Sequence, residues 1–326
     1  MLAKIRRASG AFVVDSFFKG LSGAGRLVPS ARPERHGVER ITNIAYKETN
    51  QEHHRLDVWR PSDLKGPLPV VLYIHGGGFR ILSKETHWLM ALAFARRGYV
   101  VFNINYRLSP VNPFPAAIED ACEAYSWIVR NAERWGGDAN QLIVAGESAG
   151  ANLAVGVAIA ACFERPELWA KAVFDTGVVP RCVLPACGMH QVSEPERYVA
   201  TGKMPRVIAD RIEEVSHSYL PKHLSRSDGS TGMADPVVIL EGPSAPLRPF
   251  PPTFSIAGTA DPILDDTRRL HKALTARGVR SEMRIYPGEM HAFHALVWRP
   301  NARSAWAETF RFLHEVGLTP PRHHAP

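Results

Sequence analysis

Hydrophobic positions along the chain alternate between two spacings. Short, continuous runs of β-branched and apolar residues occupy 70–74, 99–106 and 142–146, and such runs are typical of parallel strands buried on both faces. Between them, apolar residues recur with helical spacing over about 86–97 and 116–134, and glycine follows each stretch. Strands that alternate with helices predict a parallel sheet covered by helices on both faces.

Further strands and helices are predicted on either side of this segment. Residues 44–46 and 56–59 indicate antiparallel strands at an edge of the sheet. The small residues of 149–162 predict a helix that packs closely against the sheet, and 173–174 is a weaker strand candidate. The last predicted elements are strands at 253–257 and 281–286 and helices at about 265–277 and 302–315.

Two stretches depart from this rhythm. From 178 to 248 prolines are frequent, loops are rich in Ser and Gly, and a helical pattern covers 205–219, which predicts an insertion into the fold. Residues 1–21 place basic residues ahead of a short apolar stretch, as a signal peptide does. Because Asp15 interrupts that stretch and no small-residue cleavage site follows, we expect an amphipathic helix there instead.

A serine flanked by glycines directly follows the run at 142–146, in the string Gly146-Glu147-Ser148-Ala149-Gly150. A G-x-S-x-G string alone is a weak signal, and an ordinary strand-to-helix turn is the alternative. Its place between a buried strand and a small-residue helix is the setting that a nucleophile elbow requires. The glycines make room for a strained turn that sets the hydroxyl at the positive end of a helix. Ser148 is therefore the predicted nucleophile.

Three glycines follow another buried strand, in His75-Gly76-Gly77-Gly78. Glycines let backbone N–H groups approach a substrate and converge on one point, where they stabilise an oxyanion by roughly 3–4 kcal/mol per donor. A phosphate-binding loop is the alternative, but neither G-x-x-x-x-G-K-[ST] nor G-x-G-x-x-G accompanies these glycines. We expect His75 to hold the loop in place rather than to take part in catalysis.

A serine nucleophile needs a base, and the base needs an acid that orients it. Asp261 comes just after the strand expected at 253–257, and His291 just after the strand expected at 281–286. Both fall at the carboxyl ends of strands, where parallel sheets place their sites. Ser, Asp and His also follow one another in a known order for such a triad.

Neighbouring residues compete for these two roles. Asp265 and Asp266 lie close to Asp261 along the chain but look like the cap of the next helix. His294 lies close to His291 but is expected one turn into a helical segment. Their placement past strand ends favours Asp261 and His291.

Composition and charge narrow the class of protein. Hydrophobic residues make up 45% and charged residues 22%, which is typical of a globular chain with a sizeable core. The formal charge of +7 comes from scattered Lys and Arg without an aromatic-interleaved basic run, so no nucleic-acid partner is expected. The apolar stretch 142–162 contains Glu147, Ser148 and recurrent glycines, so no membrane span is expected either.

Cysteine usage favours a cytoplasmic protein without disulfides. The four cysteines, Cys122, Cys162, Cys182 and Cys187, are few for 326 residues. Cys182, Cys187 and His190 resemble a metal clip, but no fourth ligand follows at a zinc-like spacing. We expect free thiols, no metal and no organic cofactor.

Several segments carry a resemblance to a known family. Besides HGGGF at 75–79 and GESAG at 146–150, they are YRLSP at 106–110, FPAAIED at 114–120, GTADPILDD at 258–266 and PGEMHAF at 287–293. Together they resemble the bacterial hormone-sensitive lipase family of esterases, over about residues 45–315 outside the insertion. The family more often has Asp where this chain has Glu147, for which we expect a supporting structural role.

The resemblance implies an α/β-hydrolase fold, with a mostly parallel central sheet, helices on both faces and a helical cap. It assigns 41–177 and 249–326 to the catalytic core, and 1–40 and 178–248 to the cap. It also implies that the catalytic residues work without a cofactor, and that some relatives form homodimers.

The implied activity is that of a carboxylesterase for short- to medium-chain esters, acting through an acyl-enzyme on Ser148. By similarity, the oxyanion donors are the N–H groups of Gly77, Gly78 and Ala149, with His75, Gly76 and Glu147 in support. An amidase or acyltransferase with the same triad is an alternative. So is a non-hydrolytic binder, like the plant hormone receptors that resemble this family.

Overall fold

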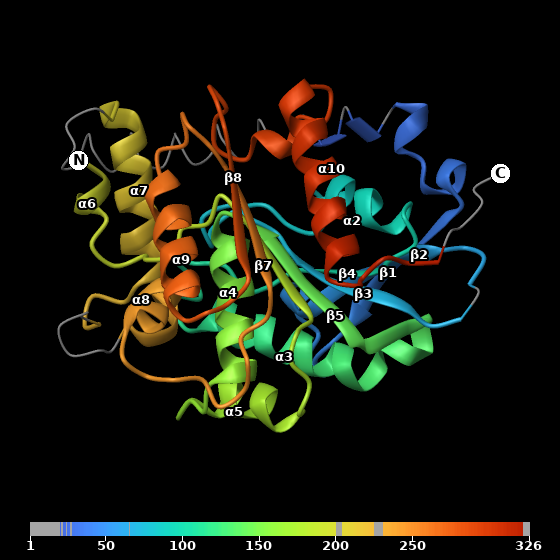
Figure 1. Ribbon diagram of the computed structural model, residues 1–326, viewed down its shortest axis with the longest axis horizontal. Coiled ribbons are helices and arrows are strands. Elements are labelled where there is room, and N and C mark those ends of the chain that lie inside the picture. The colour runs from blue at the N-terminus through green and yellow to red at the C-terminus, as the bar shows by residue number, and fades with distance from the viewer. Residues whose placement is uncertain are drawn as a thin grey trace.

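The chain folds around one mixed sheet. The structure is a computed structural model in which residues 20, 22–23, 25–26, 28–64, 66–199, 204–224 and 231–321 are described. Within these residues the strand order is β1-β2-β4-β3-β5-β6-β7-β8 (Figure 1). The pairs β1–β2 and β2–β4 are antiparallel and the others are parallel. The strands are β1 (Val38–Ala45), β2 (Arg55–Pro61), β3 (Leu68–Ile74), β4 (Val100–Ile104), β5 (Gly137–Glu147), β6 (Cys182–Ala186), β7 (Thr253–Gly258) and β8 (Ser281–Tyr286).

The middle of the sheet is buried on both faces. Every residue of β3 is buried, and β3 pairs with both β4 and β5. Its side chains alternate between two hydrophobic clusters, so that Val70 and Leu72 join one and Val71 and Tyr73 the other. The continuous apolar runs therefore correspond to central parallel strands, as predicted.

Helices cover both faces, which confirms the fold class. α2 and α10 lie on one face, and α3, α4, α5, α8 and α9 lie on the other (Figure 1). Among the described residues the helices are α2 (Trp88–Ala95), α3 (Ala116–Asn131), α4 (Ala149–Cys162), α5 (Leu168–Asp175), α6 (Glu196–Val199), α7 (Arg206–Tyr219), α8 (Pro236–Glu241), α9 (Leu264–Ala276) and α10 (Pro300–Glu315).

The strand expected at 173–174 is wrong. These residues lie in α5, where Ala170 and Val173 are buried with helical spacing. The next strand of the sheet is β6, between β5 and β7. Because β6 falls within 178–248, the sheet reaches further into the expected insertion than the composition of that stretch indicated. For the rest of the range, the division into core and cap stays a prediction.

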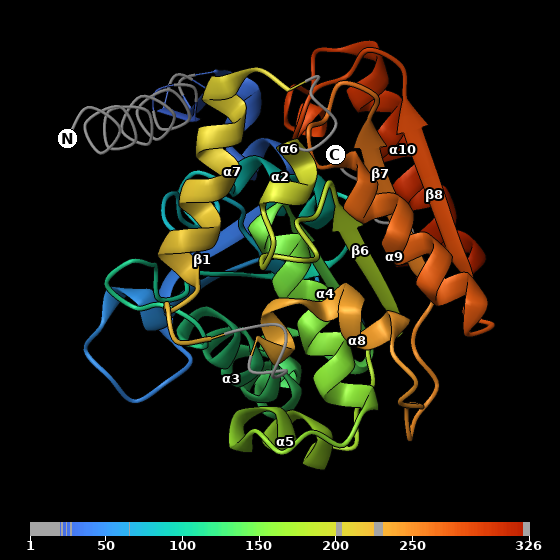
Figure 2. The ribbon, with the colours of Figure 1, turned by 90° about the vertical axis from the view of Figure 1, so that its left-hand side faces the viewer.

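α6 and α7 lie together at one end of the molecule, above α4 and α8 (Figure 2). α7 packs on the loop after β3, where a Cβ atom added to Gly78 would lie 2.6 Å from Val215 Cγ2. The amphipathic helix expected at 1–21 falls almost entirely outside the described residues. In the described part of the chain, no helix has the length and apolar character needed to cross a membrane.

Candidate active site

Ser148 occupies a strained turn between β5 and α4. Its backbone has φ 55° and ψ −116°, which L-residues rarely adopt, and its N–H donates to the Ala186 carbonyl at 2.9 Å. A Cβ on Gly150 would lie 2.0 Å from the Ile74 oxygen, and one on Gly146 would lie 2.5 Å from the Gly150 oxygen. Both glycines are therefore required, and the turn leaves Ser148 on the wall of a cavity.

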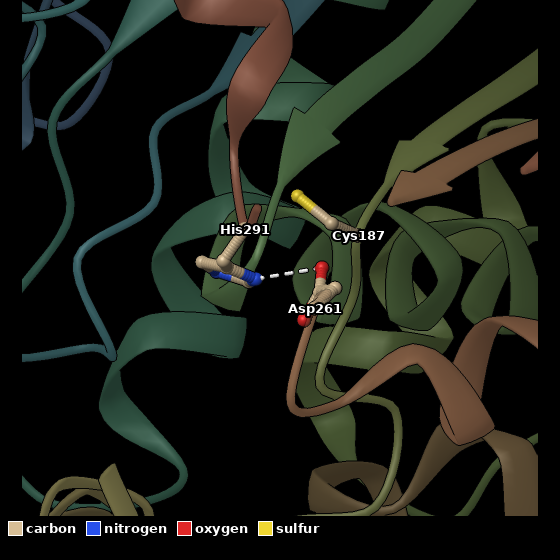
Figure 3. Close-up of side chains that lie close together, drawn as sticks. All are labelled: Cys187, Asp261 and His291. Carbon is tan, nitrogen blue, oxygen red and sulfur yellow. Dashed lines mark hydrogen bonds and ion pairs between the residues drawn. The ribbon is translucent and has the colours of Figure 1, made fainter. Parts of the chain in front are cut away.

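His291 and Asp261 meet beyond the ends of β8 and β7. His291 Nδ1 lies 2.9 Å from Asp261 Oδ2, as the dashed line in Figure 3 marks. The other carboxylate oxygen of Asp261 accepts the Ile263 N–H at 3.0 Å. Asp261 is buried, whereas the His291 side chain is 33% exposed and lines the same cavity as Ser148. Because Nδ1 is engaged by Asp261, Nε2 is the nitrogen left to exchange a proton in the cavity.

The environment of His291 favours its protonated form. Burial lowers the pKa of His291, but the carboxylate of Asp261 outweighs burial and raises that pKa above its ordinary value. A base with a raised pKa holds a proton more firmly once it has taken one. This is the electrostatic arrangement that a general base for a serine hydroxyl requires.

The rival residues lie elsewhere. His294 is buried in a short 3₁₀ helix (Phe293–Ala295), lines a separate cavity of about 30 Å³, and has its pKa lowered to about 4 by burial. Asp265 is exposed in the first turn of α9. Neither Asp265 nor Asp266 caps that helix, since its N-cap residue is Ile263, so the expectation that they form the cap is wrong.

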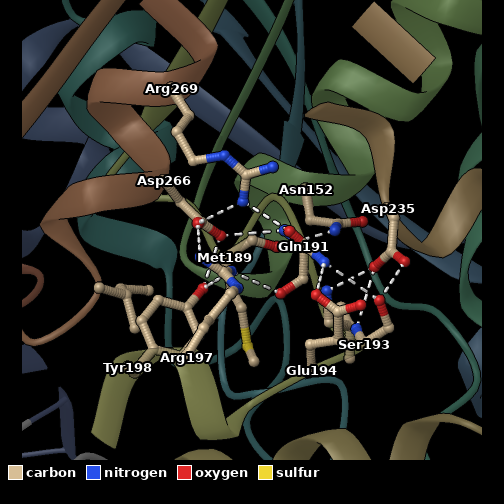
Figure 4. Close-up of polar contacts among 12 residues, drawn as sticks. Asn152, Met189, Gln191, Ser193, Glu194, Arg197, Tyr198, Asp235, Asp266 and Arg269 are labelled. Carbon is tan, nitrogen blue, oxygen red and sulfur yellow. Dashed lines mark hydrogen bonds and ion pairs between the residues drawn. The ribbon is translucent and has the colours of Figure 1, made fainter. Parts of the chain in front are cut away.

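Asp266 instead anchors the segment between β6 and α6. Its carboxylate accepts the Gln191 N–H at 2.9 Å and the Tyr198 hydroxyl at 2.6 Å, and it pairs with Arg197 Nη1 at 2.6 Å. Figure 4 shows this network continuing to Asp235, which accepts the Val192 N–H at 2.7 Å. The contacts fix the chain that leads to α6 against α9, the helix that begins just after Asp261.

The glycine loop after β3 adopts backbone conformations that only glycine tolerates well. Gly77 and Gly78 have φ of 110° and 59°. A Cβ on Gly77 would lie 2.1 Å from the Ile81 carbonyl oxygen, so no side chain fits there. Gly77, Gly78 and Ala149 all line the cavity that holds Ser148. The structure thus gathers the three expected oxyanion donors around one space.

His75 supports this loop from below. Its ring stacks on Tyr106 with a centroid separation of 4.3 Å, and its Nδ1 lies 2.7 Å from the Gly76 carbonyl oxygen. The Tyr106 hydroxyl donates to the His75 carbonyl at 2.9 Å. Burial lowers the pKa of His75 to about 3, so its ring is neutral at ordinary pH. A buried, neutral ring outside the cavity lining supports a structural role for His75.

Glu147 links the serine turn to the glycine loop. Its Oε1 accepts the Gly76 N–H at 2.5 Å and lies 2.6 Å from His87 Nε2, while its Oε2 accepts the Tyr73 hydroxyl. Burial raises the pKa of Glu147, but His87 and the hydrogen bonds lower it to about 2. His87 in turn has its pKa raised, because the carboxylate outweighs burial. Neither His87 nor Tyr73 was predicted as part of the site, because no sequence motif distinguishes them.

We predict that Glu147→Gln destabilises the fold by about 3–5 kcal/mol, because it leaves His87, whose side chain is only 11% exposed, without its counter-ion. Because the pKa of His87 is raised in the folded state, its contribution to the stability of the fold is complete below pH 6.5. Because the pKa of Glu147 is lowered, its contribution is complete above pH 4.5. Urea denaturation should therefore show the largest loss between these pH values, and a smaller one as pH rises through the raised pKa of His87. Glu133→Gln, at an exposed position, is the control; an equal loss there would contradict the assignment.

Cys187 lies beside the His291–Asp261 pair (Figure 3). Among the described residues, Cys187, Asp261 and His291 form the one group of three potential metal ligands, with ligand atoms within 4.8 Å of one another. The metal clip considered at Cys182, Cys187 and His190 is not that group. Burial and the nearby Asp261 carboxylate raise the pKa of the Cys187 thiol, which favours its uncharged form. All four cysteines lie in the described part of the chain and are free thiols, as expected.

The cavity in front of Ser148 is large, at about 1060 Å³. Apolar side chains from three regions form much of its wall: Ile208, Ile212 and Val215 of α7, Ile263 before α9, and Trp298 before α10. A pocket of this volume with a few polar groups at one point is typical of a small-molecule site. A cavity of this volume has room for a small organic molecule beside Ser148.

Comparison with known proteins gives a consistent set of relatives. The α/β-hydrolase fold family matches residues 71–295. Carboxylesterase NlhH of Mycobacterium tuberculosis is 30% identical over 289 residues, or 88% of this chain and 83% of that protein. Versiconal hemiacetal acetate esterase of Dothistroma septosporum is 26% identical over 298 residues, or 89% and 84%. The structure of a hyperthermophilic esterase from the archaeon Pyrobaculum calidifontis has a TM-score of 0.74 at 27% identity and covers 97% of this chain and 98% of that one.

The mostly parallel sheet and the strained serine turn define an α/β-hydrolase. The chain belongs to the α/β-hydrolase fold family, in the branch of the hormone-sensitive lipase-like esterases, which confirms the resemblance. As a class, the protein is a carboxylic ester hydrolase.

Proposed function

We propose that the protein is a carboxylesterase in which Ser148 is the nucleophile, His291 the general base and Asp261 the orienting acid. The observation that carries the proposal is the 2.9 Å contact of His291 Nδ1 with Asp261 Oδ2, with Ser148 and His291 on one cavity wall. The contact fixes the tautomer in which Nε2 accepts a proton.

In the first half-reaction, Ser148 Oγ attacks the ester carbonyl carbon while His291 Nε2 takes the hydroxyl proton. The Asp261 carboxylate stabilises the imidazolium that forms. The tetrahedral intermediate then collapses, the C–O bond to the alcohol breaks, and His291 returns the proton to the leaving oxygen. Ser148 is left as an acyl ester.

In the second half-reaction, water takes the place of the alcohol. His291 removes a proton from water as the water oxygen attacks the acyl carbon, and then returns it to Ser148 Oγ. In both halves the N–H groups of Gly77, Gly78 and Ala149 stabilise the oxyanion, by roughly 3–4 kcal/mol for each donor. The Glu147 bond to Gly76 holds this loop against the serine turn.

The proposed substrates are short- to medium-chain esters. The Dothistroma septosporum relative is named for an acetate ester, which supports a small acyl group here. The homodimer implied by the resemblance and the cytoplasmic location inferred from the free cysteines stay predictions.

The first test is hydrolysis of p-nitrophenyl esters from acetyl to palmitoyl, combined with labelling by a fluorophosphonate. We expect kcat/KM to be highest for the short and medium chains and to fall for palmitoyl. The phosphonate should add to the peptide that contains Ser148, as measured by mass spectrometry, and abolish turnover. A folded protein that cleaves none of these esters, or that is inactivated by label on another residue, contradicts the proposal.

A further inference from the structure

Two arginines share one carboxylate on the wall of the cavity. Arg80 Nη1 lies 2.8 Å from Glu214 Oε1, and Arg211 Nη1 lies 2.5 Å from Glu214 Oε2. The side chains of Arg80 and Arg211 are 18% and 20% exposed, and that of Glu214 is 9% exposed. Within the described part of the cavity lining, these three residues contribute two positive charges and one negative charge.

The cluster lies next to the expected oxyanion loop. Arg80 is two residues beyond Gly78, and its N–H donates to the Gly77 carbonyl at 3.1 Å. Arg211 and Glu214 belong to α7, whose Val215 packs against Gly78. The guanidinium groups therefore come from the two elements that meet at the reaction centre.

The rest of the cavity adds to this positive charge. Among the residues that the structure describes, the charged lining consists of the arginines Arg80, Arg96, Arg97, Arg211 and Arg303 and the carboxylates Glu147 and Glu214. Five positive charges against two negative ones give a formal charge of +3, and Glu147 is already paired with His87. Low-dielectric walls focus such a field within a cleft. Because Arg96, Arg97 and Arg303 are exposed, solvent screens them, and they act chiefly on approach.

We propose that the cavity selects esters that carry a carboxylate, and that the Arg80–Glu214–Arg211 cluster binds that group. The proposal rests on the proposed esterase function and names its substrate class. Arginine suits the role because its planar fork donates to a carboxylate through two parallel hydrogen bonds. The apolar wall of α7 then contacts the rest of the ester.

The test compares matched pairs of esters. One pair is 4-carboxyphenyl butyrate and its methyl ester, with the charge on the leaving alcohol. The other is methyl hydrogen adipate and dimethyl adipate, with the charge on the acyl group. Each kcat/KM is divided by the rate constant for hydrolysis of the same ester by hydroxide, which removes the difference in intrinsic reactivity. We expect this corrected kcat/KM to be about tenfold higher for the charged member of at least one pair. The preference should shrink from about 0.02 to 0.5 M NaCl, because salt screens charge.

Variants assign the preference to the cluster. Arg211→Gln should lower the charged-to-neutral ratio by about tenfold, and Arg80→Gln repeats the test from the other guanidinium. Arg206→Gln is the control, since Arg206 is exposed on the same helix and lies outside the cavity lining. Turnover of neutral esters with no preference for charge in either pair, or a preference that both variants retain, overturns this proposal but not the esterase. Failure to cleave any of the four esters overturns this proposal alone if p-nitrophenyl esters are still cleaved, and overturns both proposals if they are not.

Discussion

Replacing Ser148 with alanine is expected to reduce kcat for the best p-nitrophenyl ester by about 10⁵- to 10⁶-fold. The acyl-enzyme cannot form without Oγ, so both half-reactions are lost together. The oxyanion donors and the binding cavity remain, so a small residual acceleration over water persists. Initial rates measured over long incubations, with protein from a host that lacks its own esterases, provide the value.

The loss should not come from unfolding. Ser148 has φ 55°, so alanine meets the same backbone strain as serine and leaves the turn unchanged. We expect the Tm of Ser148→Ala to stay within a few degrees of that of the wild type. Ser304→Ala, at an exposed position of α10, is the matched control. Activity that survives in Ser148→Ala would place the nucleophile elsewhere.

The sequence predicts the centre of the fold well because burial there is complete. β3 and the second half of β5, residues 142–146, are continuous apolar runs, and α4 begins and ends at the residues expected, Ala149 and Cys162. A strand buried on both faces and a helix of small residues against it leave little choice of composition. For the same reason the serine turn can be placed without a structure.

β6 was missed because its composition does not distinguish it. Two of its five residues, Pro185 and Ala186, have weak strand propensity. It also follows α5, in which the apolar pair Val173 and Phe174 resembles a short strand in the sequence. Only pairing with β5 and β7 identifies it as part of the sheet. A short apolar pair carries no period, so helix and strand are equally compatible with it.

The supporting residues of the site were harder to predict than those of the proposed triad. Ser148, Asp261 and His291 each follow a strand, which a one-dimensional pattern reveals. His87 and Tyr73 act through contacts with Glu147 that exist only after β3, β5 and the start of α2 are brought together. The charged cluster on Glu214 likewise joins a loop to a helix more than 130 residues away in the sequence.

Asp261→Asn is expected to lower kcat by about 10⁴-fold while the fold is retained. An amide donates its N–H₂ where the carboxylate accepted from Nδ1, so it stabilises the tautomer in which Nε2 carries the proton and cannot accept another. The imidazolium formed during attack also loses its counter-charge. Single-ester kinetics at a fixed pH, with Asp265→Asn as the control at the exposed neighbouring carboxylate, measure this loss.

The pH profile of the same variant separates an orienting acid from a merely structural one. His291 must be neutral to accept a proton, so wild-type kcat/KM falls as pH drops through a pKa that Asp261 holds above 6.5. Without that carboxylate, burial is the larger remaining influence and lowers the pKa of His291. The acid limb of Asp261→Asn should therefore shift to lower pH, whereas that of Asp265→Asn should not move. An unchanged acid limb in Asp261→Asn would mean that another carboxylate sets the charge of the base.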